Sequence, residues 1–153
     1  MSSAVEVDLG EVKKLAQKVM SFMLSGGDTE KLLGELGMVI EEQTKVRFDT
    51  QLDPHGDKWR DLTEVYKKRK LKGDKNYSPS NGSTLIRGGL LADSIEHQLT
   101  DNDTILVGSP MEYADYHQNA KSVKRRREFL GINTDNIAEL QDAVDLFMRK
   151  KTA

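Results

Sequence analysis

Apolar residues recur every three or four positions in several stretches of the chain, a spacing typical of amphipathic helices. The first stretch begins near Asp8, which can cap a helix while Glu11 reaches back to it, and ends at Ser25-Gly26-Gly27. Its apolar positions are Val12, Leu15, Ala16, Val19 and Met23. The pattern predicts that the N-terminal part of the chain opens with a helix.

A second apolar stripe follows Asp28, the candidate cap of the next helix. Its members are Leu32, Leu33, Leu36, Val39, Ile40 and Val46, with Lys31, Glu35, Glu42 and Lys45 on the polar side. Gly34 and Gly37 interrupt this helix, and each weakens it by about 1 kcal/mol relative to alanine. Either these glycines allow another part of the chain to approach closely, or the helix simply tolerates them.

Two further helices are predicted nearer the C-terminus. A short basic helix is expected from Thr63 to Lys72. The last helix is capped by Asn133 or Thr134, has Asp135 in its first turn, and ends with Arg149, Lys150 and Lys151. Its apolar stripe consists of Ile137, Leu140, Val144 and Phe147.

The segment between these helices carries the alternating pattern of β-strands. In Ser94–Leu99, the residues Ile95, His97 and Leu99 share one face. Thr100–Asp103 is a turn and Thr104–Val107 the returning strand, which predicts a hairpin with a four-residue loop. A third strand is expected around Phe129-Leu130. The fold class is therefore α+β, a small antiparallel sheet (hairpin plus one or two further strands) packed against about four helices.

Turn-forming residues divide the 153-residue chain, which has the size of one domain. We expect residues 1–50 to be a helical N-terminal part, 51–83 a loop-rich basic segment, 84–132 the sheet region and 133–153 the C-terminal helix. Within the second part, residues 51–57 form a turn, Trp59 pins the loop to the core, and Gly73–Ser83 is a long loop, the best candidate for a mobile segment.

Composition excludes several classes of protein. The chain has no cysteine, which rules out disulfides and thiolate metal sites and agrees with assembly in a reducing cytoplasm. Its formal net charge is -2, so the molecule as a whole is not a nucleic-acid polycation. No run of residues predicts a membrane span or a signal peptide, so we expect no membrane partner.

Candidate chemistry is sparse. His55, His97 and His117 lie far apart in the sequence, and we interpret His97 as a half-buried strand residue and His117 as a hydrogen-bonded packing residue. The series Asp53, His55, Asp57 and Glu64 superficially resembles a calcium loop, but Lys58 occupies the position that requires glycine. We therefore expect no enzyme activity, no metal and no cofactor. A small hydrolase with a site centred on His117 remains an alternative.

Two basic clusters stand out from this background. One contains Lys67, Lys68, Arg69, Lys70, Lys72 and Lys75, and the other contains Lys121, Lys124, Arg125, Arg126 and Arg127. They could contact phosphates in a nucleic-acid-binding adaptor, with salt-dependent affinity, through residues 67–75 and 121–127. The other interpretations are a solvated face and a protein interface against an acidic neighbour. We favour these two over nucleic-acid binding.

A set of short motifs in a fixed order carries a family resemblance. The motifs are Gln51-Leu52-Asp53-Pro54-His55-Gly56-Asp57-Lys58-Trp59, Leu85-Ile86-Arg87-Gly88-Gly89-Leu90-Leu91-Ala92-Asp93-Ser94-Ile95, Val107-Gly108-Ser109, Tyr113-Ala114 with His117-Gln118, and Phe129-Leu130-Gly131. Together they resemble the virion morphogenesis (tail completion) family of Mu-like phages with contractile tails. The chain departs from that family at Asn119-Ala120, where glycine is common, and at Glu128, where proline is common.

The resemblance implies a structural role in the virion. Such a protein caps the head-proximal end of the tail tube or sheath and makes the tail competent for head-tail joining, as a ring that is commonly hexameric. The implied partners are further copies of the chain, the tube or sheath protein, and a connector or neck protein, with assembly in the host cytoplasm. DNA contact, if basic residues face a lumen, is expected to be non-specific.

We selected interface candidates from the motifs and the basic clusters. Besides the loop Gly73–Ser83 and the hairpin edge, they are Lys67, Lys68, Arg69, Lys75, Tyr77, Tyr113, His117, Gln118, Arg125, Arg126, Arg127 and Phe129.

Overall fold

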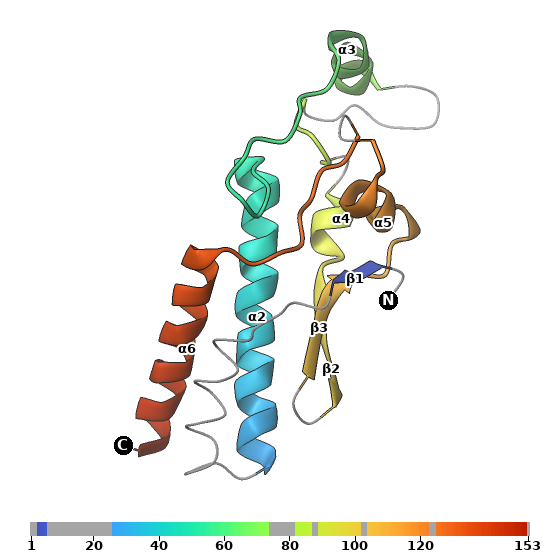
Figure 1. Ribbon diagram of the computed structural model, residues 1–153. Helices are drawn as coiled ribbons and strands as arrows, with labels where there is room; N and C mark the ends of the chain where they lie inside the picture. Colours follow the sequence, from blue (N-terminus) through green and yellow to red (C-terminus); the bar gives the residue numbers. More distant parts are fainter. Residues whose placement is uncertain are drawn as a thin grey trace.

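The computed structural model describes residues 3–5, 26–73, 82–86, 89–101, 104–122 and 125–152. A long central helix, α2 (Gly26–Thr50), has the C-terminal helix α6 (Thr134–Thr152) along one side and a three-stranded sheet along the other (Figure 1). The hydrophobic core lies between these layers. This arrangement confirms the predicted α+β class.

Helix α2 begins before its predicted cap. Asp28 lies in the first turn instead of preceding it, and its carboxylate pairs with Lys151 Nζ at 2.7 Å. The acidic start of α2 is thereby joined to the basic end of α6, which runs antiparallel to it. Both charges also suit the dipoles of their helix ends.

The apolar face of α2 is mostly as predicted. Leu32, Leu33, Leu36 and Ile40 are buried, and Val39 is half-buried. The inclusion of Val46 is wrong, because its side chain is 43% exposed. At 3.6 residues per turn the inner face continues instead through Thr44, Arg47 and Phe48, all of which are buried.

The two glycines of α2 differ in their surroundings. A Cβ atom added at Gly37 would lie 2.5 Å from Cδ2 of His97, whereas one added at Gly34 would meet nothing within 4 Å. Close approach is therefore required at Gly37 only, where the imidazole of His97 lies against the helix. The same ring meets Glu41, whose Oε1 is 2.6 Å from His97 Nδ1.

The sheet has the order β1-β3-β2, from strands β1 (Ser3–Val5), β3 (Thr104–Ser109) and β2 (Glu96–Asp101). Both pairings are antiparallel, so Val5 and His97 flank Val107 on its two sides. The hairpin was predicted correctly. Its connection is shorter than the four residues expected, because Asp101 already pairs with Thr104.

The third strand is not the one predicted. Phe129 and Leu130 belong to an extended segment that no strand pairs with among the described residues. Their backbone N–H groups instead donate to Oε1 of Gln118, each at 3.0 Å, and Gln118 Nε2 donates to the Leu130 carbonyl at 3.0 Å. A buried side-chain amide thus replaces a neighbouring strand, which satisfies the backbone without a ladder.

Two helices were not predicted, α4 (Leu90–Asp93) and α5 (Glu112–Asn119). Of α5 only Ala114 and Gln118 are buried, so this helix carries too short an apolar stripe to reveal itself in the sequence.

Helix α6 confirms the prediction made for it. Asn136 N donates to Asn133 Oδ1 at 2.8 Å, and Asn133 N donates back to Asn136 Oδ1 at 3.1 Å, a reciprocal cap. Leu140, Val144 and Phe147 are buried in the core, and Ile137 is half-buried against it.

Some predictions fall outside the described residues. They are the N-terminal helix from Asp8 to Met23, most of the loop Gly73–Ser83, and the side chains of Lys75, Tyr77 and Lys124. The division of the chain into four parts of one domain stays a prediction.

Candidate interaction surface

Helix α3 (Glu64–Lys72) confirms the short basic helix, with Thr63 as its N-cap accepting from Tyr66 N at 3.3 Å. It lies at one end of the molecule, away from the pair of α2 and α6 (Figure 1). Its apolar residues face outward, since Val65 is 79% exposed and Leu71 52%. Its one buried residue is Lys70. The structure therefore leaves this helix with an uncovered apolar and cationic face.

Polar contacts attach α3 to the rest of the chain. Thr84 N donates to Gln51 Oε1 at 2.7 Å, and Gln51 Nε2 donates to the Thr84 carbonyl at 3.0 Å. Lys70 Nζ donates to the carbonyl of Ser83. At the start of the helix, Lys67 Nζ lies 3.3 Å from Asp61 Oδ2. The N–H of Leu62 first, and then Lys67, lower the pKa of the Asp61 carboxyl.

The second basic segment meets the base of this helix. Arg127 Nε donates to the carbonyl of Arg60 at 3.2 Å, just before α3, and Arg127 N donates to His117 O at 2.8 Å. Burial, with a contribution from Arg60, lowers the pKa of the Arg127 guanidinium. The end of the second cluster therefore lies beside the residues that lead into α3, the helix that carries most of the first cluster.

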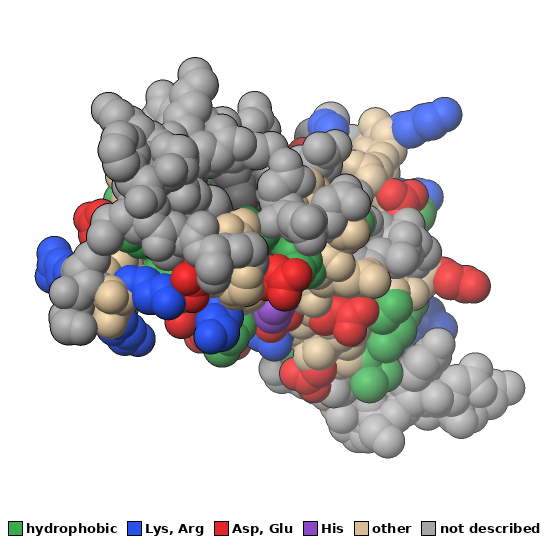
Figure 2. Space-filling model, turned by 90° about the horizontal axis from the view of Figure 1, so that it is seen from below, with side chains coloured by type: hydrophobic (Ala, Val, Ile, Leu, Met, Phe, Trp, Pro, Cys, Tyr) green, Lys and Arg blue, Asp and Glu red, His purple; other side chains and the backbone are tan. Residues whose placement is uncertain are grey.

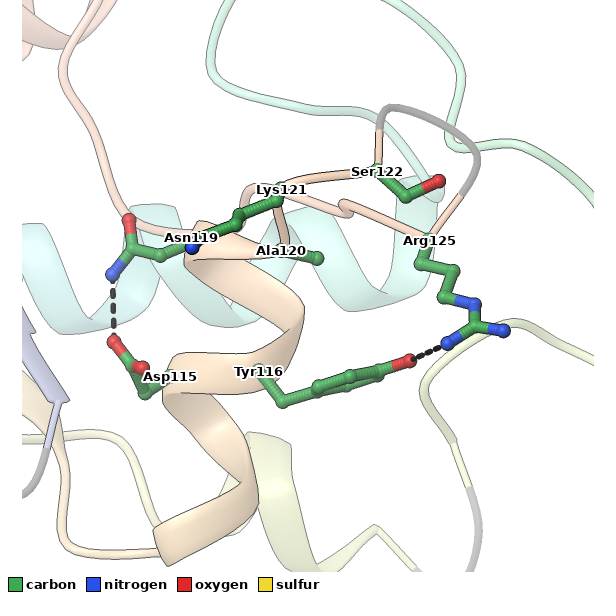
Figure 3. A pocket seen from close by; sticks show the side chains of 7 residues that line it. All are labelled: Asp115, Tyr116, Asn119, Ala120, Lys121, Ser122 and Arg125. Atoms are coloured by element: carbon green, nitrogen blue, oxygen red, sulfur yellow. Dashed lines mark hydrogen bonds between the residues drawn. The ribbon is translucent and has the colours of Figure 1, made fainter.

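A cavity of about 380 Å³ opens beside the end of α5 (Figure 3). It is lined by Asp115, Tyr116, Asn119, Ala120, Lys121, Ser122 and Arg125. Two hydrogen bonds cross its walls, from Asn119 Nδ2 to Asp115 Oδ1 at 2.7 Å and from Arg125 Nη1 to the Tyr116 hydroxyl at 3.2 Å. The cationic side chains of Lys121 and Arg125 in this lining suit an acidic group of a partner. No histidine is among its lining residues to activate Ser122.

His117 packs between aromatic neighbours on α5. Its ring centroid is 5.5 Å from that of Tyr116 and 6.4 Å from that of Tyr113. The predicted packing is confirmed, but hydrogen bonding is wrong for Nδ1, which is buried without a partner in the described part of the chain. Burial first, and then Arg127, lower the pKa of His117 and favour a neutral ring. A hydrolase would require a group that orients its catalytic histidine, and none contacts this nitrogen.

The loop with calcium-like spacing is a turn. Asp53 Oδ1 accepts from His55 N at 2.8 Å and from Asp57 N at 2.9 Å, so the carboxylate holds its own backbone. Among the described residues there is no group of three or more His, Cys, Asp or Glu that could hold a metal ion. Trp59 confirms its anchoring role, because it is buried and its Nε1 donates to Glu128 O at 2.8 Å.

The interface candidates from the sequence separate into three groups. Lys68, Arg69, Tyr113, Arg125 and Arg126 are exposed, and Lys67, His117 and Arg127 are half-buried. Gln118 and Phe129 lie inside the core, where they stabilise the fold and present no side-chain surface. Lys75 and Tyr77 lie outside the described residues.

Sequence reasoning missed Val65, Leu71 and Tyr116 as surface residues. Apolar residues inside a strongly basic helix were the available signal for the first two, because a helix that is solvated all round gains nothing from them.

None of the helices that the structure describes is long and apolar enough to cross a membrane.

Comparison with known proteins identifies the class to which this fold belongs. Residues 7–148 match the phage virion morphogenesis family. "Mu-like prophage FluMu G protein 1" of Haemophilus influenzae (strain ATCC 51907 / DSM 11121 / KW20 / Rd) is 35% identical over 132 residues, which cover 84% of this chain and 80% of that protein. No solved structure matches the chain. The chain belongs to the phage virion morphogenesis family, which confirms the resemblance and gives it a role in phage morphogenesis.

Proposed function

We propose that the protein is a structural, non-catalytic component of the phage tail or neck, and that it works without a cofactor. It caps the head-proximal end of the tail tube or sheath as a ring and makes the tail competent for joining to the head. Membership of the virion morphogenesis family supports the general role. Capping, joining and ring formation are the specific content of the proposal.

The observation that carries it is the uncovered face of α3. Val65, Tyr66 and Leu71 are all more than two-fifths exposed, on a helix that polar contacts hold at the end of the molecule. Apolar surface left in water forfeits about 25 cal/mol per Å². A protein that assembles with neighbours recovers this free energy when the exposed helix is buried at the interface.

The part of the surface seen from below also suits protein partners. In the view from below, cationic and anionic side chains alternate, and apolar side chains lie among acidic ones (Figure 2). A face of mixed charge favours protein contacts that are specific in register.

A phage deleted for this gene and complemented with the wild-type gene tests the function. Without the protein we expect tails of abnormal length, or finished heads and tails that fail to join, in electron micrographs of lysates. Complementation with Val65→Asp should reproduce the defect, whereas Leu90→Asp, at a site 61% exposed on α4, serves as the matched control. Normal tails joined to heads in the deletion would show that the proposal is wrong.

A nucleic-acid-binding adaptor is the second candidate, because Arg127 and Arg60 bring the two basic segments together. It predicts duplex binding whose affinity falls steeply with salt. Replacing Arg125, Arg126 and Arg127 with glutamate should then abolish binding in a filter or anisotropy assay. Retained binding, or none by the wild type, would exclude this adaptor.

A further inference from the structure

We propose that α3 of one copy docks on the exposed acidic face of α6 of the next copy. This head-to-tail contact would be the repeating interface of the ring, so the inference rests on the proposed function and deepens it by naming the surfaces. It follows from three properties of the described helices: the composition of each exposed face, the spacing of the residues along that face, and the position of each helix in the molecule.

The exposed face of α3 combines one apolar residue with cations. Val65, Lys68, Arg69 and Lys72 are all exposed, and their spacing of three and four positions puts them on one side of the helix. The buried Lys70 marks the opposite side. The helix thus presents one hydrophobic residue near its N-terminal end, followed by three positive charges.

The outer face of α6 has the reverse composition. Asp135, Glu139, Asp142 and Leu146 are exposed at positions four, three and four apart, so they form one stripe. Leu146 is 53% exposed. The core residues Leu140, Val144 and Phe147 lie on the other side of the helix, and at the edge of the stripe Glu139 Oε2 accepts a hydrogen bond from Gln43 Nε2 of α2 at 2.8 Å. Here a hydrophobic residue lies at the C-terminal end of a row of three carboxylates.

The two faces match in an antiparallel arrangement. With Val65 opposite Leu146, the next pairs are Arg69 with Asp142 and Lys72 with Glu139, because both helices step by four and then by three residues. The matched segment is about 10 Å long at 1.5 Å per residue. Opposite charges around an apolar contact provide the complementarity that fixes register and excludes wrong partners.

The contact must join two copies. Helix α3 lies at one end of the molecule, whereas α6 extends along the side of α2 toward the other end (Figure 1). A chain therefore cannot place its own α3 on its own α6. A contact between two different surfaces leaves one of each unused at every step, so it repeats from copy to copy and forms a ring where its rotation closes.

A second copy fits the α3 face better than a nucleic acid does. Phosphates would use the cations but would leave Val65, which is 79% exposed, in water. The acidic stripe on α6 also needs a partner of positive charge, and the same chain supplies one. Binding of a nucleic acid to the α3 face is one of the outcomes that the test distinguishes.

Introduced thiols test the contact directly, since the chain has no cysteine. We would substitute Val65→Cys together with Leu146→Cys in the full chain and oxidise it, both purified and in assembled particles. The expected result is a ladder of covalent oligomers on denaturing gels, up to the number of copies in the ring. The control pair Leu90→Cys with Leu146→Cys also places both thiols at exposed positions and should give no ladder. Assembly without a ladder in the test pair would overturn the inference.

Charge reversal gives an independent readout by light scattering, read against wild-type protein that has been shown to assemble. Arg69→Glu alone and Asp142→Arg alone should each lower assembly at least tenfold, and mixing the two variants should restore it, because each variant keeps one face that complements the other. Glu42→Arg, an exposed reversal on α2, should leave assembly unchanged.

The outcomes separate this inference from the proposed function. Normal assembly of both single variants, or loss of duplex binding by Arg69→Glu with assembly unchanged, overturns the contact while the deletion phenotype still supports capping. A wild-type protein that stays monomeric in solution and in particles overturns both.

Discussion

Helices α6 and α3 both end in positive charge, yet the molecule uses them differently. Helix α6 buries Leu140, Val144 and Phe147 in the core and is tied to α2 by the pair of Lys151 and Asp28. Helix α3 buries only Lys70 and leaves Val65 and Leu71 exposed. The comparison teaches that one helix stabilises the fold, whereas the other contributes little to it and is available for contacts outside the chain.

The largest expected effect is in the core face of α6. Leu140→Ala removes a fully buried side chain and should lower the free energy of unfolding by about 2–5 kcal/mol, from lost burial and the cavity left behind. Leu71→Ala on α3 should change it by less than about 0.5 kcal/mol. Urea unfolding measures both. Equal losses would show that α3 is part of the cooperative core and would break the comparison.

A smaller effect is expected along α2, where a packed position can be compared with an open one. Gly37→Ala places a methyl group against the His97 ring and should cost about 1–3 kcal/mol. Gly34→Ala meets open space and should stabilise the helix by up to about 1 kcal/mol. Thermal melting of the two variants would contradict this geometry if both shifted in the same direction.

The N-caps of α6 and α3 allow a further comparison, because losing an N-cap typically costs about 1 kcal/mol of stability. Asn133→Ala breaks the reciprocal cap of α6 and should lower global stability by about that amount. Thr63→Ala removes the cap of α3, but it should speed amide hydrogen exchange within Glu64–Lys72 and leave global unfolding nearly unchanged. A loss of global stability by Thr63→Ala equal to that of Asn133→Ala would argue that the helices unfold together.

The smallest effect concerns pH at the end of the molecule that carries α3. Burial and Arg127 lower the pKa of His117 below 6.5, so the unfolded chain binds more protons than the folded one at acidic pH. His117 therefore costs no stability well above pH 6.5 and lowers stability as the pH falls below it. His117→Gln should make the decline in urea midpoint between about pH 7 and pH 5 shallower. An unchanged decline would show that protonation of this ring is not coupled to folding.

Local signals in the sequence predicted much of the fold. Asn133 as a cap, the buried stripe of α6 and the hairpin depend on neighbours a few residues away, and the sequence displays them directly. Val46 was misplaced because two apolar residues near the end of α2 lie only two positions apart, on different sides of the helix, and Phe48 takes the inner face.

The interface candidates were harder to predict. Exposed cations such as Lys68 and Arg125 followed from composition. Gln118 and Phe129 were chosen from two of the family motifs, but they stabilise each other inside the core through the hydrogen bond from Phe129 N to Gln118 Oε1. A sequence motif indicates that its residues are important, but it does not indicate whether their side chains face a partner or the interior.

By itself the sequence determined where α3 and α6 begin, most of the apolar stripes of α2 and α6, and the family to which the chain belongs. Only the tertiary structure decided that β1 completes the sheet beside β3, that Gln118 takes the place of a strand, and that α3 stays uncovered. Helix caps and stripes arise from contacts within one or two turns, whereas burial depends on which distant segment arrives to cover each face. For α3, no segment that the structure describes covers Val65 or Leu71.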